Sequence, residues 1–204
     1  MVAHWMMDAT VALAERGFYW GPGVLNRDLM DLITVWMRTA DESGAFQMAG
    51  IGRSERRQES AAIRGDRIHW LQQDNRHQAL GAAWSLIETL RETLNRELFA
   101  GLVDFEGHLA IYPPGGFYKK HVDTFRDDDA RSITLIIYLG EDWRPEFGGE
   151  LRVYHSPDSV KDYPPTPGSV VLFDARRFAH EVLPTTAERR SLTGWYRVRT
   201  GRLP

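Results

Sequence analysis

The chain has 204 residues, of which 43% are hydrophobic and 26% are charged, and its formal net charge is −3. A chain of this length can bury a substantial core within one domain, and its composition has no basic excess of the kind that nucleic-acid binding needs. It contains no cysteine. Disulfides, thiolate metal sites and cysteine nucleophiles are therefore excluded, and any transition metal must be held by histidine and carboxylate side chains.

No targeting or membrane segment is evident. Residues 1–17 lack the cationic start and the long apolar stretch of a signal peptide. No segment approaches the roughly 20 apolar residues of a membrane span. We therefore expect a cytoplasmic, monomeric protein that binds neither membrane nor nucleic acid.

The first elements in chain order are helical. Residues 8–16 predict a short helix that Gly17 ends, and residues 18–20 are strand-like. Asn26 can cap a second helix. Its apolar residues recur at helical spacing: Leu29, Leu32, Ile33 and Trp36.

A polar stretch separates these helices from the next elements. Residues 40–62 show little periodicity and predict a long loop, which in a compact domain is either functional or disordered. Residues 67–72 (RIHWLQ) predict a strand. A long amphipathic helix follows, marked by Leu80, Ala83, Ile87, Leu90, Leu94 and Leu98.

From residue 102 the chain changes to short strands broken by glycine and proline. The expected strands are 103–112, 116–122, 131–139, 150–154, 169–174, 179–184 and 189–199. This spacing is typical of a small barrel or sandwich. We expect an α+β fold in a single domain over residues 1–204, with helical support in 1–101 and the β core in 102–200.

Three residues of the second half form a candidate metal site. His121 and Asp123 are separated by one residue, and His180 follows 57 residues after Asp123. His121 and Asp123 alone would fit a solvated turn. Two imidazoles and one carboxylate on one side of an ion, however, leave positions open for other ligands, as in the facial triad of non-haem Fe(II) oxygenases.

A cation follows on the last strand. Arg189, Ser191, Thr193 and Trp195 share one face of that strand, because side chains alternate. An inward-facing guanidinium is costly unless it meets an anion, and its planar fork suits a carboxylate. Arg190 faces the other way, toward solvent or a surface acid. Tyr138 offers a hydroxyl to the same carboxylate.

With these residues the chain resembles the 2-oxoglutarate- and Fe(II)-dependent oxygenases, and within them the hypoxia-inducible-factor prolyl hydroxylases and their bacterial relatives. The resemblance covers most of the second half and reaches into the first. Its matching stretches are RGDRIHW (64–70), YPPGGFYKKHVD (112–123), RSITLIIYLGEDW (131–143), GGELRVY (148–154) and HEVLPTTAERRSLTGWY (180–196).

The resemblance implies a double-stranded β-helix of the jelly-roll, cupin-like kind, with N-terminal supporting helices. It makes His121, Asp123 and His180 the iron ligands. Fe(II) would be the cofactor, 2-oxoglutarate and O2 the cosubstrates, and ascorbate a supporting reductant. The residues implied to bind 2-oxoglutarate are Arg189, Tyr138, Tyr112, Thr193 and Trp195.

On the substrate side, the resemblance implies contacts from Arg131, Arg64 and Asp66 and an enclosing loop at 40–66. We also expect Asp66 to pair with Arg131 when substrate binds and so tie this loop to the barrel. The segment FRDDDA (125–130) departs from the family pattern, and we expect this protein's own specificity there.

The implied reaction is 4-hydroxylation of a prolyl residue in a protein, with succinate and CO2 as coproducts. Elongation factor Tu is the first candidate substrate, by resemblance to the bacterial relatives. One alternative is the same chemistry on a free amino acid or small metabolite. A second is a catalytically silent protein that binds 2-oxoglutarate or senses oxygen.

Overall fold

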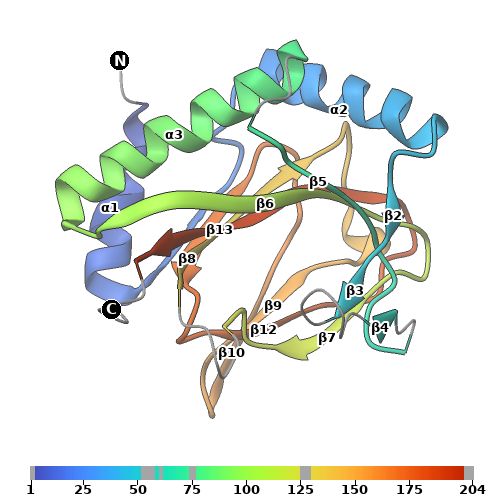
Figure 1. Cartoon of the computed structure of the whole chain (residues 1–204). Helices are drawn as coiled ribbons and strands as arrows, with labels where there is room; N and C mark the ends of the chain where they lie inside the picture. The colour runs from blue at the N-terminus through green and yellow to red at the C-terminus, as the bar shows by residue number, and fades with distance from the viewer. Residues whose placement is uncertain (1–2, 52–57, 60–61, 74–76, 125–129, 200–204) are drawn as a thin grey trace.

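The computed structural model describes residues 3–51, 58–59, 62–73, 77–124 and 130–199. Three helices lie together over one side of a large sheet, and a smaller sheet lies on its other side (Figure 1). The helices are α1 (His4–Arg16), α2 (Arg27–Glu42) and α3 (Gln78–Leu98). None of them, within the described part of the chain, has the length and apolar character needed to cross a membrane.

The helix ends follow the local signals in the sequence. Gly17 ends α1 with a left-handed φ of 70°, and its N–H donates to the carbonyl of Leu13. The side chain of Asn26 caps α2 by accepting from the backbone N–H of Asp28 at 2.7 Å. Both predicted ends are confirmed. The first helix starts earlier than predicted, because Trp5 and Met6 extend its buried side.

All pairings between the named strands are antiparallel. The large sheet has the order β1 (Phe18–Gly21), β11 (Val170–Asp174), β8 (Arg131–Leu139), β13 (Arg189–Val198), β6 (Leu102–Tyr112), β5 (Arg67–Trp70), β2 (Gln47–Met48). The small sheet has the order β10 (Ser159–Tyr163), β9 (Leu151–Ser156), β12 (Ala179–Val182), β7 (Tyr118–His121). A hairpin of β3 (Gly50–Ile51) with β4 (Gln58–Glu59) and a 3-10 turn at Pro145–Phe147 complete the elements. The predicted α+β jelly-roll architecture is confirmed.

The two faces of β13 divide the molecule into core and site. Leu192 and Tyr196 point toward the helices and belong to the main hydrophobic cluster, and the Tyr196 hydroxyl donates to the carbonyl of Ile87 at 2.8 Å. Thr193 and Trp195 point the other way, into the space between the sheets. The alternation predicted for this strand is therefore confirmed.

Two sequence predictions need correction. The stretch 40–62 is not a loop throughout, because α2 continues to Glu42 and short strands occur at Gln47–Met48, Gly50–Ile51 and Gln58–Glu59. Strand β10 (Ser159–Tyr163) was not predicted, since four of its five side chains are exposed and give no apolar alternation. The segment 125–129 lies outside the described residues, so the prediction about FRDDDA stays untested.

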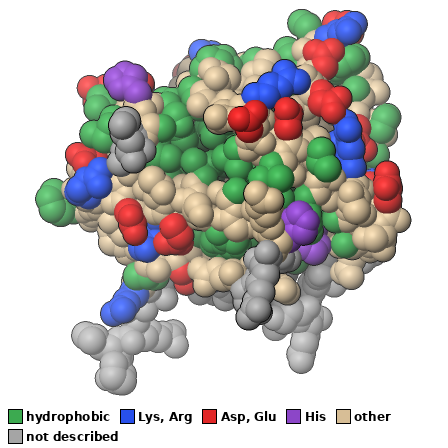
Figure 2. Space-filling view, turned by 90° about the horizontal axis from the view of Figure 1, so that it is seen from above, with side chains coloured by type: hydrophobic (Ala, Val, Ile, Leu, Met, Phe, Trp, Pro, Cys, Tyr) green, Lys and Arg blue, Asp and Glu red, His purple; other side chains and the backbone are tan. Residues whose placement is uncertain are grey.

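The face that carries the helices is electrostatically mixed. Figure 2, which views the molecule from above, shows Lys and Arg side chains interspersed with Asp and Glu. This mixture agrees with the small net charge of −3.

Candidate active site

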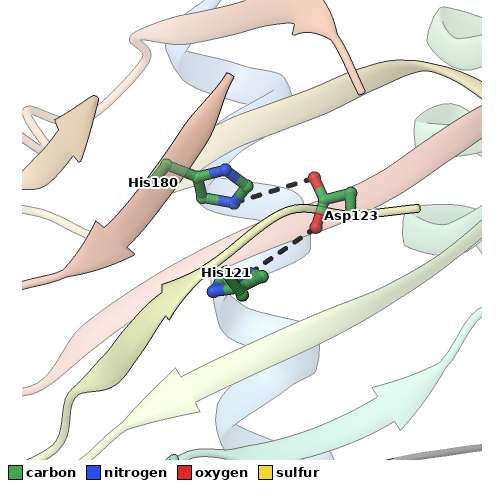
Figure 3. A group of neighbouring side chains, drawn as sticks. All are labelled: His121, Asp123 and His180. Carbon is green, nitrogen blue, oxygen red and sulfur yellow. Dashed lines mark ion pairs between the residues drawn. The ribbon is translucent and has the colours of Figure 1, made fainter. Parts of the chain in front are cut away.

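Strand pairing in the small sheet brings distant residues of the chain together. His180 on β12 lies directly opposite His121 on β7, and their ring centroids are 4.3 Å apart. Asp123 follows two residues after His121, where the chain has left β7. The three side chains therefore converge on one point from two neighbouring strands and the turn that follows one of them (Figure 3).

The distances within this triad suit a shared ion. Nε2 of His121 lies 3.6 Å from Oδ1 of Asp123, and Nε2 of His180 lies 3.7 Å from Oδ2. One potential ligand atom from each residue falls within 4.8 Å of the others. The donor set of two imidazoles and one carboxylate is the one that non-haem Fe(II) takes in a facial triad. The donor atoms of these three residues therefore fit Fe(II).

The surroundings of both histidines orient them for this task. Nδ1 of His121 lies 2.7 Å from the carbonyl of Lys119, and Nδ1 of His180 lies 3.1 Å from the carbonyl of Phe178. A carbonyl only accepts, so each Nδ1 carries a proton, and each Nε2 faces the point where an ion would bind. Burial lowers the pKa of His180, opposed in part by Asp123.

Asp123 is buried but ionised. Burial alone would raise the pKa of its carboxyl group. The neighbouring His180 and His121 outweigh that cost, together with a hydrogen bond that Thr134 Oγ1 donates to Oδ2 at 2.7 Å. The pKa therefore stays well below its usual range, and the carboxylate is available as an anionic ligand.

The triad opens into a cavity of about 660 Å³ between the two sheets. Residues of both sheets line it. They include Arg64, Ile68, Trp70, Glu106, His108, Tyr112, Tyr118, Arg131, Ile136, Leu151, Val182, Arg189, Thr193 and Trp195. Apolar walls with a few polar groups are the usual make-up of a small-molecule site.

Arg189 supplies a buried cation at this cavity. Its side chain lies between the rings of Tyr112 and Tyr138, with the guanidinium carbon 4.9 Å from each centroid. Nε donates to the carbonyl of Gly149 at 2.9 Å. A side chain at Gly149 would crowd it, since an added Cβ would lie 3.2 Å from Arg189 Cδ. No carboxylate among the described residues pairs with Arg189.

Tyr138 sits beside this cation with an unused hydroxyl. The side chain is fully buried and is not itself among the residues lining the cavity. Its hydroxyl has no hydrogen-bond partner in the described structure. Burial raises the pKa of Tyr138 despite the opposing charge of Arg189, so the hydroxyl keeps its proton and can donate.

Comparison with known proteins agrees with this geometry. Residues 107–197 match the model of the 2OG-Fe(II) oxygenase superfamily. The chain is 32% identical over 196 residues to mouse prolyl hydroxylase EGLN3, which covers 90% of this chain and 80% of the relative. The chain belongs to the 2OG-Fe(II) oxygenase superfamily. It is also 31% identical over 150 residues to human Egl nine homolog 1, where it spans only 35% of the relative.

Solved structures of other oxygenases share the whole fold. A prolyl-4-hydroxylase from Pseudomonas putida is 36% identical, with a TM-score of 0.86, over 96% of this chain and 100% of that one. A prolyl hydroxylase from Trichoplax adhaerens, solved with a hypoxia-inducible-factor peptide fragment, is 26% identical with a TM-score of 0.82. The match covers 97% of this chain and 94% of that one.

The structure places most of the predicted oxygenase residues at one cavity. Arg189, Tyr112, Thr193 and Trp195 line it, as do the predicted substrate contacts Arg131 and Arg64. Arg190 lies on the other face of β13 and pairs with Glu188, a surface acid, as predicted.

Asp66 and Arg131 have other partners in this structure, so their pairing on substrate binding stays a prediction. Both carboxylate oxygens of Asp66 accept from Arg64, at 2.7 Å and 2.6 Å. Arg131 instead donates to Glu106 at 2.5 Å and to the carbonyl of Asp123 at 3.1 Å. The nearer partner prevails because Arg64 is two residues from Asp66, and its planar fork matches the carboxylate.

The cavity residues that sequence reasoning missed include Glu106 and His108. Burial lowers the pKa of His108 to about 3, helped by the charges of Arg64 and Arg131, so its imidazole is neutral. Its Nδ1 has no hydrogen-bond partner in the described structure. Strand alternation from Tyr112 would have pointed both side chains inward, because 106, 108 and 112 have the same parity.

Proposed function

We propose that this oxygenase hydroxylates a prolyl residue in a polypeptide at C4, using Fe(II), 2-oxoglutarate and O2 and releasing succinate and CO2. One observation carries the proposal. The histidine–carboxylate triad and the unpaired cation of Arg189 meet at the same cavity. Support also comes from the names of the relatives, which are prolyl hydroxylases.

His121, Asp123 and His180 would hold the iron. When bound, Fe(II) supplies the activation of O2, driven by oxidation of 2-oxoglutarate, that hydroxylation of an unactivated carbon requires. The protein holds its three ligands on one side and so leaves positions open. The backbone carbonyls behind the two imidazoles and the Thr134 hydroxyl behind Asp123 fix the ligand orientation.

Arg189 would bind the distal carboxylate of 2-oxoglutarate. Its guanidinium carries Nη groups toward the cavity while Nε stays on Gly149. The hydroxyl of Tyr138 would donate to the same carboxylate, which satisfies a buried donor that otherwise has no partner. Tyr112, Thr193 and Trp195 would bound the cosubstrate along the same wall.

The substrate would enter on the side of Arg131. Arg131 stacks on Trp195 at 3.5 Å and lies beside Asp123, close to where the reacting carbon must come. Arg64 and Asp66 form an ion pair with each other, so we propose that they shape the substrate site. Arg64 stacks on Tyr118 at 4.4 Å, and its bridge with Tyr118 joins the 40–66 segment to β7. This segment would then enclose the substrate.

The test is incubation of the protein with Fe(II), 2-oxoglutarate and a cell lysate, followed by a proteomic search for new hydroxyproline. Elongation factor Tu is the first purified substrate to try, on resemblance to the bacterial relatives. We expect a 16 Da gain on a proline, lost with His121→Ala and Asp123→Ala. Robust turnover of 2-oxoglutarate on small molecules with no protein hydroxylation would contradict the proposal. Hydroxylation retained in both variants would contradict the assigned iron ligands.

A further inference from the structure

A chain of four alternating charges runs along the cavity face of the large sheet. Arg131 on β8 donates to Oε1 of Glu106 on β6 at 2.5 Å. Oε2 of Glu106 accepts from Arg197 on β13 at 2.9 Å. Arg197 also donates to both carboxylate oxygens of Asp104, at 2.7 Å and 2.8 Å. The chain therefore joins three neighbouring strands through side chains alone.

The strand register explains this arrangement. Trp195 lies directly opposite Glu106, and Arg197 lies opposite Asp104, on the paired strands β13 and β6. Arg131 reaches from β8 across the ring of Trp195 to Glu106, with its guanidinium carbon 3.5 Å from the ring centroid. Stacking and ion pairing together leave the Arg131 side chain little freedom.

The inner end of this network of charges contacts the triad. Nη1 of Arg131 donates to the backbone carbonyl of Asp123 at 3.1 Å, on the turn that follows β7. Side-chain exposure falls from 41% at Asp104 to 14% at Arg131, so the network leads from the surface to the buried site. Asp123 lies outside a strand, and this contact anchors its backbone carbonyl.

We propose that Glu106 is a positioning residue for the metal site. Supported by Arg197 and Asp104, it holds Arg131 where Arg131 fixes the backbone of Asp123. The inference rests on the proposed iron ligation by His121, Asp123 and His180. Glu106 has no assigned contact with the ion, and its effect is transmitted through Arg131.

Glu106 also lines the cavity, so a direct contact with the substrate is the rival explanation. Arg197 distinguishes the positioning role from a substrate contact, because it pairs with Glu106 but is not among the cavity-lining residues. A positioning role predicts that Arg197→Gln weakens the metal site in the same direction as Glu106→Gln. A substrate contact predicts a change in peptide KM with no change in metal affinity.

The chain offers a matched control. Arg152 and Asp162 form a cross-strand pair between β9 and β10 with two bonds of 2.8 Å each, similar in geometry to Arg197 and Asp104. Their side chains are 37% and 38% exposed, against 34% and 41% for Arg197 and Asp104. Arg152→Gln therefore removes a comparable ion pair that, among the described residues, makes no hydrogen bond to the triad.

The experiment measures Mn(II) affinity of the purified protein without cosubstrate, by the electron paramagnetic resonance signal of free Mn(II). Groups behind metal ligands typically change metal affinity by about 10–100-fold, and Glu106 acts one contact further out, so we expect about 3–10-fold weaker binding for Glu106→Gln. Arg197→Gln should weaken binding less, and the double variant should be no weaker than Glu106→Gln alone. Arg152→Gln should bind as the parent does.

Each outcome bears on one claim. Parent-like Mn(II) affinity in both Glu106→Gln and Arg197→Gln would overturn the positioning role while leaving the proposed function intact. If the parent itself binds no Mn(II), the proposed metal site fails and this inference fails with it. If Glu106→Gln does not fold, as judged by thermal unfolding, Arg197→Gln still decides the question.

Discussion

Replacing Arg189 by methionine should separate stability from cosubstrate binding. Arg189 is buried at 6% exposure. Its side chain contacts aromatic rings and one backbone carbonyl, but no acid among the described residues. A buried charge without a counterion opposes folding, and replacing it by an apolar side chain of similar volume is often neutral or stabilising. We expect Arg189→Met to leave the free energy of unfolding of the ligand-free protein unchanged or higher.

Binding of 2-oxoglutarate should fall steeply in the same variant. Two charge-assisted hydrogen bonds from the guanidinium, at about 1.5–3 kcal/mol each, together contribute about 3–6 kcal/mol. At 1.4 kcal/mol per factor of ten, the loss is on the order of 10²–10⁴-fold in Kd. Arg189→Lys keeps the charge but not the fork and should lose about half of this free energy.

The assay is calorimetric titration of 2-oxoglutarate into the Mn(II)-loaded protein without oxygen, together with urea unfolding of the metal-free protein. Arg190→Met is the matched control, because Arg190 lies on the opposite face of β13 and pairs with Glu188. It should leave 2-oxoglutarate affinity unchanged. Parent-like affinity in Arg189→Met would refute the assignment. A large loss of stability would refute the argument that this cation awaits an anion.

Three further predictions follow from single contacts. Thr134→Val removes the hydrogen bond to Asp123 Oδ2 and should weaken Mn(II) binding about tenfold in the same titration; equal affinity would contradict its role. As pH falls from 6.5, the unfolded chain takes up a proton on His108, whereas the buried imidazole of the native state, with its pKa of about 3, does not. At pH 5 this costs the native state about 2 kcal/mol, so urea unfolding of His108→Met should show a smaller acid loss than the parent. Phe99 ends α3 at a left-handed φ of 51° and is 90% exposed, so Phe99→Gly should raise the free energy of unfolding by about 0.5–1 kcal/mol, unlike Phe99→Ala.

The triad could be predicted because its chemistry restricts residue type. The chain lacks cysteine, so only histidine and carboxylate side chains could hold a transition metal. Strand alternation then placed Arg189 and Trp195 on one face and Arg190 on the other, which the cavity lining and the Glu188 pair bear out. The strand faces depend only on a period of two residues, which is a local property, whereas the choice of the three candidate ligands also drew on the resemblance to the oxygenases.

Elements without an apolar pattern could not be predicted in this way. Strand β10 exposes most of its residues and is held by its pairing with β9, where Arg152 and Asp162 face each other. The short strand Gln47–Met48 has both side chains exposed and forms by pairing with β5. In both cases the partner strand, rather than the sequence of the segment, decides the conformation.

The charge chain behind the triad illustrates a further limit. Alternation assigns Glu106 and Arg197 to the cavity face of their strands, but it names no partner for either. Their contact joins residues 91 positions apart, and the pairing of β13 with β8 shifts between Tyr196 and Arg197. This irregularity lies opposite Arg131, the residue that completes the chain of contacts to Asp123. A one-residue change in that register would give Arg131 a different neighbour without altering any local pattern. The support of the candidate triad is thus a property of strand register, while the choice of its residues draws on composition, spacing and the family resemblance.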